Sequence, residues 1–184
     1  MTINPYAPPA AVVGDIDADV PASVPTPFFA VSVWKLAVLS FCTLGAYEIY
    51  WFYKNWQLIR DREQSTILPF WRAFFGVIFC HACFSNIRSH GVASGVTPPL
   101  AAGILAIGWI VTTVSWRLPD PYWLISLLAV VFMLPVQAHV NRINEVHVPG
   151  HDPNAQFSAL NWVAVIAGGS LLGLAIAGTL IPEA

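Results

Sequence analysis

Long apolar stretches alternate with short polar ones along this chain. A helix that crosses a bilayer needs about 20 consecutive apolar residues, and five stretches come close to that length. They occupy approximately residues 31–53, 69–87, 100–116, 122–138 and 160–181. The pattern therefore predicts an all-α fold, a polytopic membrane helix bundle of about five transmembrane helices. The count falls to four if the short third stretch enters the membrane without crossing it.

The first 27 residues differ from the rest in composition. They contain six prolines and three aspartates but no Lys or Arg. Such a segment buries too little apolar surface to offset the entropy lost on ordering it, so a disordered tail is predicted for residues 1–27. The transmembrane helical domain would then occupy residues 28–184.

Composition strengthens the membrane interpretation. Hydrophobic residues make up 57% of the 184 residues and charged residues only 10%, whereas a soluble domain carries about a quarter charged residues. The lipid bilayer is therefore the first expected partner. A net charge of −2 gives no reason to expect nucleic-acid binding.

Basic residues predict an orientation, because loops on the cytoplasmic side are enriched in Lys and Arg. Five of them lie in or beside the loops that follow the first and third stretches, namely Lys54, Arg60, Arg62, Arg72 and Arg117. Three lie on the opposite side, namely Lys35, Arg88 and Arg142. This difference predicts a multi-pass protein with its N-terminus outside and its C-terminus inside.

The run Ser40-Phe-Cys-Thr43-Leu44-Gly45-Ala-Tyr47-Glu-Ile-Tyr50-Trp51-Phe-Tyr53-Lys54 is distinctive. It resembles the motif of uncharacterised bacterial membrane proteins in a domain-of-unknown-function family. Residues 69–75 and 141–144 look similar to later parts of longer members, so the likeness covers approximately residues 28–181. It implies a small polytopic protein of the bacterial inner membrane, and it implies no activity or catalytic residue.

Aromatic residues crowd both ends of the loop between the first two stretches. They are Tyr47, Tyr50, Trp51, Tyr53, Trp56 and Trp71. Tyrosine and tryptophan concentrate where a span meets water, so the pattern predicts an aromatic belt at the membrane interface. An aromatic ligand cage is the functional alternative.

Two ionisable residues lie inside predicted spans, where charge is costly and often functional. Glu48 lies about 7 Å, and Arg72 about 5 Å, from the ends that face the same loop, at a rise of 1.5 Å per residue. Neighbouring antiparallel helices would bring the two to one level. We therefore predict an intramembrane Glu48–Arg72 ion pair, which would lock two helices together or, alternatively, couple to ion or proton movement.

Cys80 and Cys83, in the stretch FCHACF, raise the question of redox or metal chemistry. In a helix their Cβ atoms would lie about 5–6 Å apart, too far for an undistorted disulfide. Zinc needs four converging ligands, and His147 and His151 have ligand spacing but are separated by Pro149-Gly150. Packing is the favoured interpretation, so no metal and no cofactor are expected, and these four residues are weak candidates only.

The last two apolar stretches carry one helix-face pattern each. Gln137, Asn141 and Asn144 recur at helical spacing and predict a polar stripe on a solvated helix end, with a metal or ligand site as the alternative. Gly169, Gly173 and Ala177 recur every four residues and form a face of small residues that favours close helix packing. The partner would be another span of this chain or a second copy of it.

No nucleophile–base pair or carboxylate dyad follows from the spacing of the residues. We therefore expect a protein that is not an enzyme and that acts as a structural or regulatory partner of another membrane protein. The alternative is a small transporter or channel, formed by one copy or by several. It would use Glu48, Arg72 and the polar groups near Gln137–Asn144. A metal or redox protein would depend on Cys80 and Cys83.

Overall fold

A computed structural model describes residues 25–180, and every regular element within that range is a helix. In chain order the elements are α1 (Val33–Cys42), α2 (Ala46–Glu63), α3 (Pro69–Phe74), α4 (Gly76–Ala93), α5 (Ala102–Val114), the 3-10 helices η1 (Ser115–Arg117) and η2 (Tyr122–Leu128), α6 (Ala129–His147) and α7 (Ala159–Leu180). The predicted all-α class is confirmed. Residues 1–24, which include most of the predicted tail, and residues 181–184 lie outside the described residues.

Two helices in the described part of the chain are long and apolar enough to cross a bilayer. They are Tyr122–His147, which combines η2 with α6, and Ala159–Thr179 in α7. The prediction of about five such helices was wrong. The fifth apolar stretch matches α7 closely, and the fourth is the beginning of a helix that continues to His147. Among the described residues, no helix from the first three stretches is both long and apolar enough to span, although α2 and α4 have 18 residues each.

A tight turn interrupts the first stretch. Leu44 and Gly45 have φ of 53° and 86°, in the left-handed region that ends a helix. The Thr43 hydroxyl donates to the carbonyl of Leu39 at 2.7 Å and accepts from the Tyr47 amide at 3.0 Å. α1 is therefore only 10 residues long, about 15 Å, and α2 begins as a separate helix.

The second stretch is divided into two helices, and the third forms a helix shorter than predicted. The second breaks at Phe75, where ψ of 41° departs from helical geometry and separates α3 from α4. In the third, α5 has 13 residues before η1 begins. A helix of that length spans about 20 Å, less than the hydrocarbon thickness of about 30 Å.

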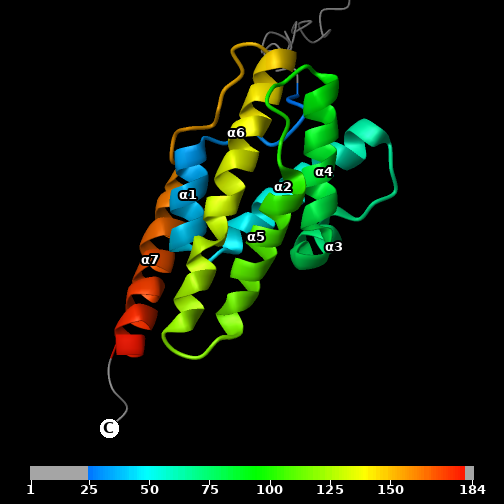
Figure 1. Cartoon of the computed structure of the whole chain (residues 1–184). Coiled ribbons are helices and arrows are strands. Elements are labelled where there is room, and N and C mark those ends of the chain that lie inside the picture. Colours follow the sequence, from blue (N-terminus) through cyan, green and yellow to red (C-terminus); the bar gives the residue numbers. More distant parts are fainter. Residues whose placement is uncertain (1–24, 181–184) are drawn as a thin grey trace, which may run out of the picture.

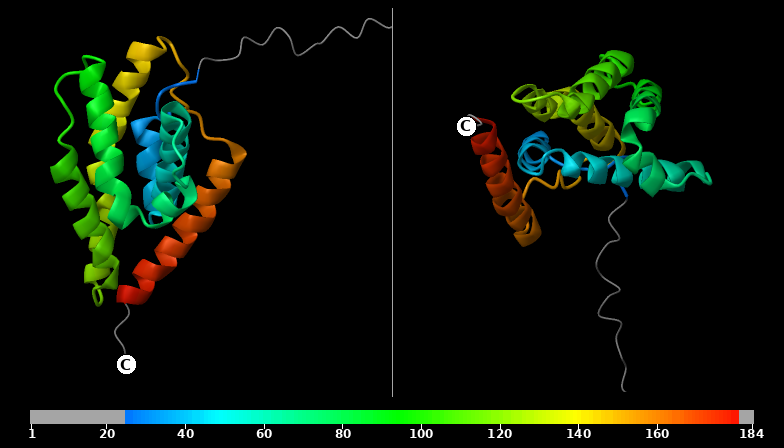
Figure 2. Two further views of the ribbon diagram at one scale, coloured as in Figure 1. Left: turned by 90° about the vertical axis from the view of Figure 1, so that its right-hand side faces the viewer. Right: turned by 90° about the horizontal axis from the view of Figure 1, so that it is seen from below.

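The helices form one bundle with two ends (Figure 1). The upper end, as drawn, holds residues 25–32, 94–101 and 148–158, and the lower end holds the turn 43–45 and residues 115–121. α5 and α6 lie side by side, and α7 packs along α1 at one edge of the bundle (Figure 2). α2 turns back from the lower end, so that Arg62 donates to the carbonyl of Pro27 at 2.7 Å.

This return of α2 changes the distribution of charge. The predicted orientation assigned Arg60 and Arg62 to the side opposite the N-terminal segment. The bond from Arg62 to Pro27 places them at the same end, so that grouping of basic residues was wrong. The cause is the turn at 43–45. Because it reverses the direction of the chain, α2 ends on the side of the bundle where α1 begins.

The interior of the bundle is mainly apolar but also buries several polar side chains, and many large apolar side chains lie on the outer surface. Ile104 is 75% exposed, Leu160 80% and Leu174 71%, whereas Gln137 and Asn144 are completely buried. A protein surrounded by water would bear the cost of such large apolar patches. The arrangement is the one expected where the outer surface contacts lipid.

α7 packs on α1 through the helix face that carries Gly168, not through the predicted face that carries Gly169. A Cβ added to Gly168 would overlap the backbone carbonyl of Cys42, whereas nothing lies within 4 Å of the corresponding position at Gly169 or Gly173. Gly173 and Ala177 are exposed. The predicted face of Gly169, Gly173 and Ala177 is therefore not the contact within this chain, and the alternative of a second copy stays a prediction.

Candidate functional site

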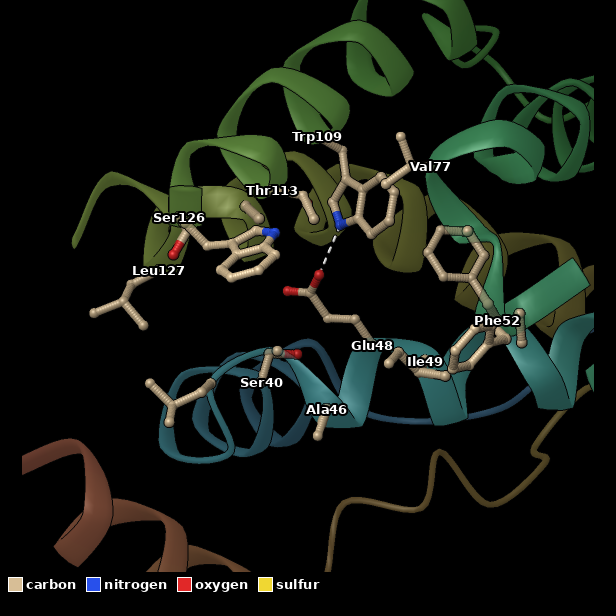
Figure 3. A pocket seen from close by; sticks show the side chains of 17 residues that line it. Ser40, Ala46, Glu48, Ile49, Phe52, Val77, Trp109, Thr113, Ser126 and Leu127 are labelled. Atoms are coloured by element: carbon tan, nitrogen blue, oxygen red, sulfur yellow. Dashed lines mark hydrogen bonds between the residues drawn. The ribbon is translucent and has the colours of Figure 1, made fainter. Parts of the chain in front are cut away.

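A cavity of about 320 Å³ lies beside the turn that joins α1 to α2 (Figure 3). α1, α2, the α3–α4 junction, α5 and η2 all contribute to its walls. Its volume falls at the lower end of the range for small-ligand sites, about 300–1,000 Å³. We call it the Glu48 cavity, after the one carboxylate among its lining residues.

Glu48 projects into the cavity from the first turn of α2. The positive end of the helix dipole favours a carboxylate there, and Glu48 is only 4% exposed. Its Oε2 accepts a hydrogen bond of 2.6 Å from the Trp109 indole of α5. Oε1 accepts none from the described residues, and Figure 3 shows it pointing away from Trp109. One oxygen of a buried carboxylate is therefore left for another donor.

Two hydroxyl groups line the same cavity without a partner. The Ser40 hydroxyl, from α1, and the Thr113 hydroxyl, from α5, are buried and make no hydrogen bond within residues 25–180. Ser40 is 2% exposed. A buried polar group that stays unpaired costs about 1–3 kcal/mol, so two at one cavity indicate a site built for something else to bind.

Aromatic rings complete the walls. Trp109, Phe52 and Trp116 all line the cavity, and the Phe52 and Trp109 rings pack edge to face with centroids 5.0 Å apart. Aromatic faces attract cations through their negative quadrupole. A carboxylate oxygen, two hydroxyl acceptors and aromatic faces together suit a small cation that carries N–H donors.

Sequence reasoning identified Glu48 but missed its neighbours. Ser40 lies in the motif that was singled out, yet nothing in its spacing marks it as functional. Trp109 and Thr113 lie four residues apart on α5, where they read as ordinary residues of an apolar stretch. The α1–α2 turn places Ser40 at the cavity with Glu48, and only the tertiary fold adds Trp109 and Thr113 from α5.

The predicted ion pair between Glu48 and Arg72 does not form. The Arg72 guanidinium instead lies over the rings of Trp56 and Phe79, 4.5 and 5.3 Å from their centroids. Side-chain ion pairs among the described residues are Arg60–Asp61 and His151–Glu145. The prediction assumed two straight antiparallel spans, and the breaks at residues 43–45 and at Phe75 remove that geometry.

The predicted aromatic belt is divided by the fold. Trp51 and Trp56 are 0% and 2% exposed and belong to the core, so placing them at the interface was wrong. Tyr50 and Trp71 are exposed, while Tyr47 and Tyr53 are half-buried. The reason is that α2 buries one face, which carries Trp51 and Trp56, against neighbouring helices, while Tyr50 lies on its exposed face.

The predicted polar stripe is a set of internal hydrogen bonds. Gln137 accepts from the Trp51 indole and donates to the carbonyls of Phe29 and Val31 at 3.2 and 3.0 Å. Asn144 accepts from the Phe28 amide at 3.1 Å and donates to the Phe28 carbonyl at 3.0 Å. The expectation of a solvated helix end was therefore wrong.

Two further side chains hold the same extended segment. Asn141 donates to the carbonyl of Val31 at 3.0 Å, and Asn55 accepts from the Phe29 amide at 3.1 Å. We call the set of Asn55, Gln137, Asn141 and Asn144 the polar clamp. It fastens residues 28–31 between α2 and α6.

The weak metal candidates do not converge on one site in the described part of the chain. Cys80 and Cys83 are buried free thiols on α4, His151 faces Glu145 at 3.3 Å, and the ring of His147 lies 5.0 Å from that of His90. No group of three or more His, Cys, Asp or Glu residues in the described part of the chain could hold a metal ion. We build no site on them.

No protein-family model, curated protein or solved structure matches this chain. The resemblance to uncharacterised bacterial membrane proteins therefore stays a prediction.

Proposed function

We propose that this protein is a non-enzymatic integral membrane protein that binds an ammonium group in the Glu48 cavity. One observation carries the proposal. The free oxygen of the buried Glu48 carboxylate and the unpartnered hydroxyls of Ser40 and Thr113 line the same cavity. These groups accept hydrogen bonds, and an ammonium ion supplies donors together with the opposite charge.

A membrane location is supported by two helices of spanning length and by the apolar outer surface. The bacterial inner membrane is the location that the motif resemblance implies. We further propose that the upper end faces the cytoplasm, the reverse of the orientation that the sequence predicts. Basic residues gather at or near that end, namely Lys35, Arg60, Arg62, Arg88 and Arg142, while Arg72 and Arg117 lie toward the other.

Transport through the bundle receives no separate support. A transporter would use Glu48, Arg72 and the polar groups near Gln137–Asn144. The amides of Gln137 and Asn141 are instead bonded to the backbone of residues 29–31. Groups already paired in this way are structural, and binding at the Glu48 cavity is the function that the geometry favours.

The test is thermal unfolding of the purified protein in detergent with ethanolammonium chloride, compared with sodium chloride at equal ionic strength. A ligand that binds only the folded state raises Tm with concentration. We expect ethanolammonium to raise Tm of the wild type more than sodium does, and Glu48→Gln to lose that difference. The matched control is Glu145→Gln, the same change at an exposed upper-end glutamate. Equal Tm values in the two salts for the wild type would contradict the proposal.

A further inference from the structure

We propose that the ammonium group bound in the Glu48 cavity belongs to a zwitterionic phospholipid with a primary-amine headgroup, such as phosphatidylethanolamine, and that Arg117 holds its phosphate. This inference rests on the proposed function, because it names the molecule that carries the ammonium. Three observations support it: the rim of the cavity, the free guanidinium beside it, and the depth at which both lie.

The rim of the Glu48 cavity is apolar. Among its lining residues, those with the most exposed large side chains are Trp116 at 62%, Phe74 at 59%, Leu44 and Ile49 at 47%, and Val77 at 39%. The large side chains exposed at such a mouth offer apolar contacts, which a small polar ligand arriving from water cannot use. A lipid headgroup reaches it directly, because acyl chains can lie against the apolar rim while the amine turns inward.

Arg117 lies beside this rim. Its guanidinium is 5.5 Å from the ring centroid of Trp116, which itself lines the cavity. Arg117 is exposed and makes no ion pair with the described residues. Arginine binds phosphate through two parallel N–H bonds. A headgroup with an anionic phosphate and a cationic amine therefore matches Arg117 and Glu48 at the same time.

The depth of the cavity fits a headgroup. The first spanning helix begins at Tyr122, and the exposed Trp116 and Tyr122 flank the loop before it, as aromatic residues do at a membrane interface. Ser126, which lines the cavity, is only about 8 Å along that 3-10 helix, at about 2.0 Å per residue. Phosphate and amine would therefore lie within one headgroup length of the interface.

The acceptor set favours a primary amine over choline. A primary ammonium carries three N–H donors, and three acceptors in the cavity lack partners, namely Glu48 Oε1 and the hydroxyls of Ser40 and Thr113. The trimethylammonium of choline has no N–H group, and phosphatidylglycerol has no cation. We therefore expect phosphatidylethanolamine to bind more tightly than phosphatidylcholine or phosphatidylglycerol.

The experiment titrates delipidated protein in detergent with short-chain phosphatidylethanolamine, phosphatidylcholine or phosphatidylglycerol and follows Tm. We expect the ethanolamine lipid to act at concentrations at least about tenfold lower than the other two, a difference of about 1.4 kcal/mol. Arg117→Gln should weaken the response to this lipid and leave the response to free ethanolammonium unchanged. Glu48→Gln should remove both, and Arg142→Gln, an exposed upper-end control, should change neither.

The outcomes separate the two proposals. Suppose that the three lipids raise Tm equally, while the Tm response to free ethanolammonium still requires Glu48. Lipids then bind only around the outer surface, so the inference fails and the proposed function stands. If free ethanolammonium has no effect, both fail. If Glu48→Gln does not fold, Thr113→Val replaces it, and an unchanged preference for the ethanolamine lipid in that variant would also overturn the inference.

Discussion

The polar clamp and the Glu48 cavity both bury polar side chains between helices, but they pair them differently. In the clamp, Asn144 uses its donor and its acceptor on the backbone of Phe28. Gln137 donates to the carbonyls of Phe29 and Val31 and accepts from the Trp51 indole. In the cavity, the hydroxyls of Ser40 and Thr113 have no partner among residues 25–180. The same kind of residue therefore has two roles, and the completeness of its hydrogen bonding distinguishes them.

This difference has a physical basis. A buried polar group that is fully paired stabilises the fold modestly, and it costs free energy only when its partner is removed. A buried polar group that is unpaired costs free energy until a ligand pairs with it. Mutations in the clamp should therefore lower stability and leave binding intact, whereas mutations in the cavity should do the reverse.

The largest expected effect is that of Gln137→Leu. It leaves the Trp51 indole and the Phe29 carbonyl unpaired, at about 1–3 kcal/mol each. We expect the free energy of unfolding to fall by about 3 kcal/mol, which corresponds to a Tm lower by about 6–12 °C. The Tm increase caused by ethanolammonium should persist. Gln57→Leu, which removes a single bond to Tyr53, is the control, and equal losses in both variants would refute the role of the clamp.

A smaller effect of opposite sign is expected for Thr113→Val. Valine keeps the shape and removes a hydroxyl that has no partner, so the free energy of unfolding should rise by about 1 kcal/mol. Ethanolammonium should bind roughly tenfold more weakly, because one hydrogen bond to a charged group is lost. The control is Thr112→Val on the same helix, whose hydroxyl donates to the Gly108 carbonyl at 2.7 Å. A Thr113 variant that is less stable but binds normally would reverse the comparison.

The smallest expected effect concerns pH at the clamp end. The ring of His90 packs edge to face against Phe28, with centroids 5.3 Å apart. Burial lowers the pKa of His90 below its ordinary 6.5, as do the charges of Arg62 and His147, while Glu63 acts in the opposite direction. The folded state therefore resists protonation, so stability is retained above pH 6.5 and falls as the pH drops through that value toward the lower pKa.

We expect Tm to be lower at pH 5.5 than at pH 7.5 and His90→Phe to reduce this difference. The measurement is made in the Glu48→Gln background, so that the carboxylate of the cavity does not contribute. His81→Phe, at an exposed position of the same helix, is the control. If His90→Phe leaves the pH dependence of Tm unchanged, His90 is not its source.

Sequence reasoning predicted local features better than the relations between helices. The all-α class and the bounds of α7 followed from apolar length, and Glu48 stood out as a carboxylate in an apolar stretch. The Glu48–Arg72 pair, the interface positions of Trp51 and Trp56 and the solvated stripe from Gln137 to Asn144 all failed. Each of these depended on which helix faces which, and residue spacing along one helix does not specify its neighbours.

The sequence by itself determined that the chain is helical and apolar. It predicted one continuous first span, and the structure interrupts that span at Leu44 and Gly45, in a conformation that favours glycine at the second residue. Only the tertiary structure decided what this interruption does. By turning α2 back along the bundle, it brings Glu48 beside Trp109 and Asn55 beside the Phe29 amide. The reason is that buried side chains find their hydrogen-bond partners on segments that are distant in the sequence. Gln137 and Val31, for example, are 106 residues apart in the chain.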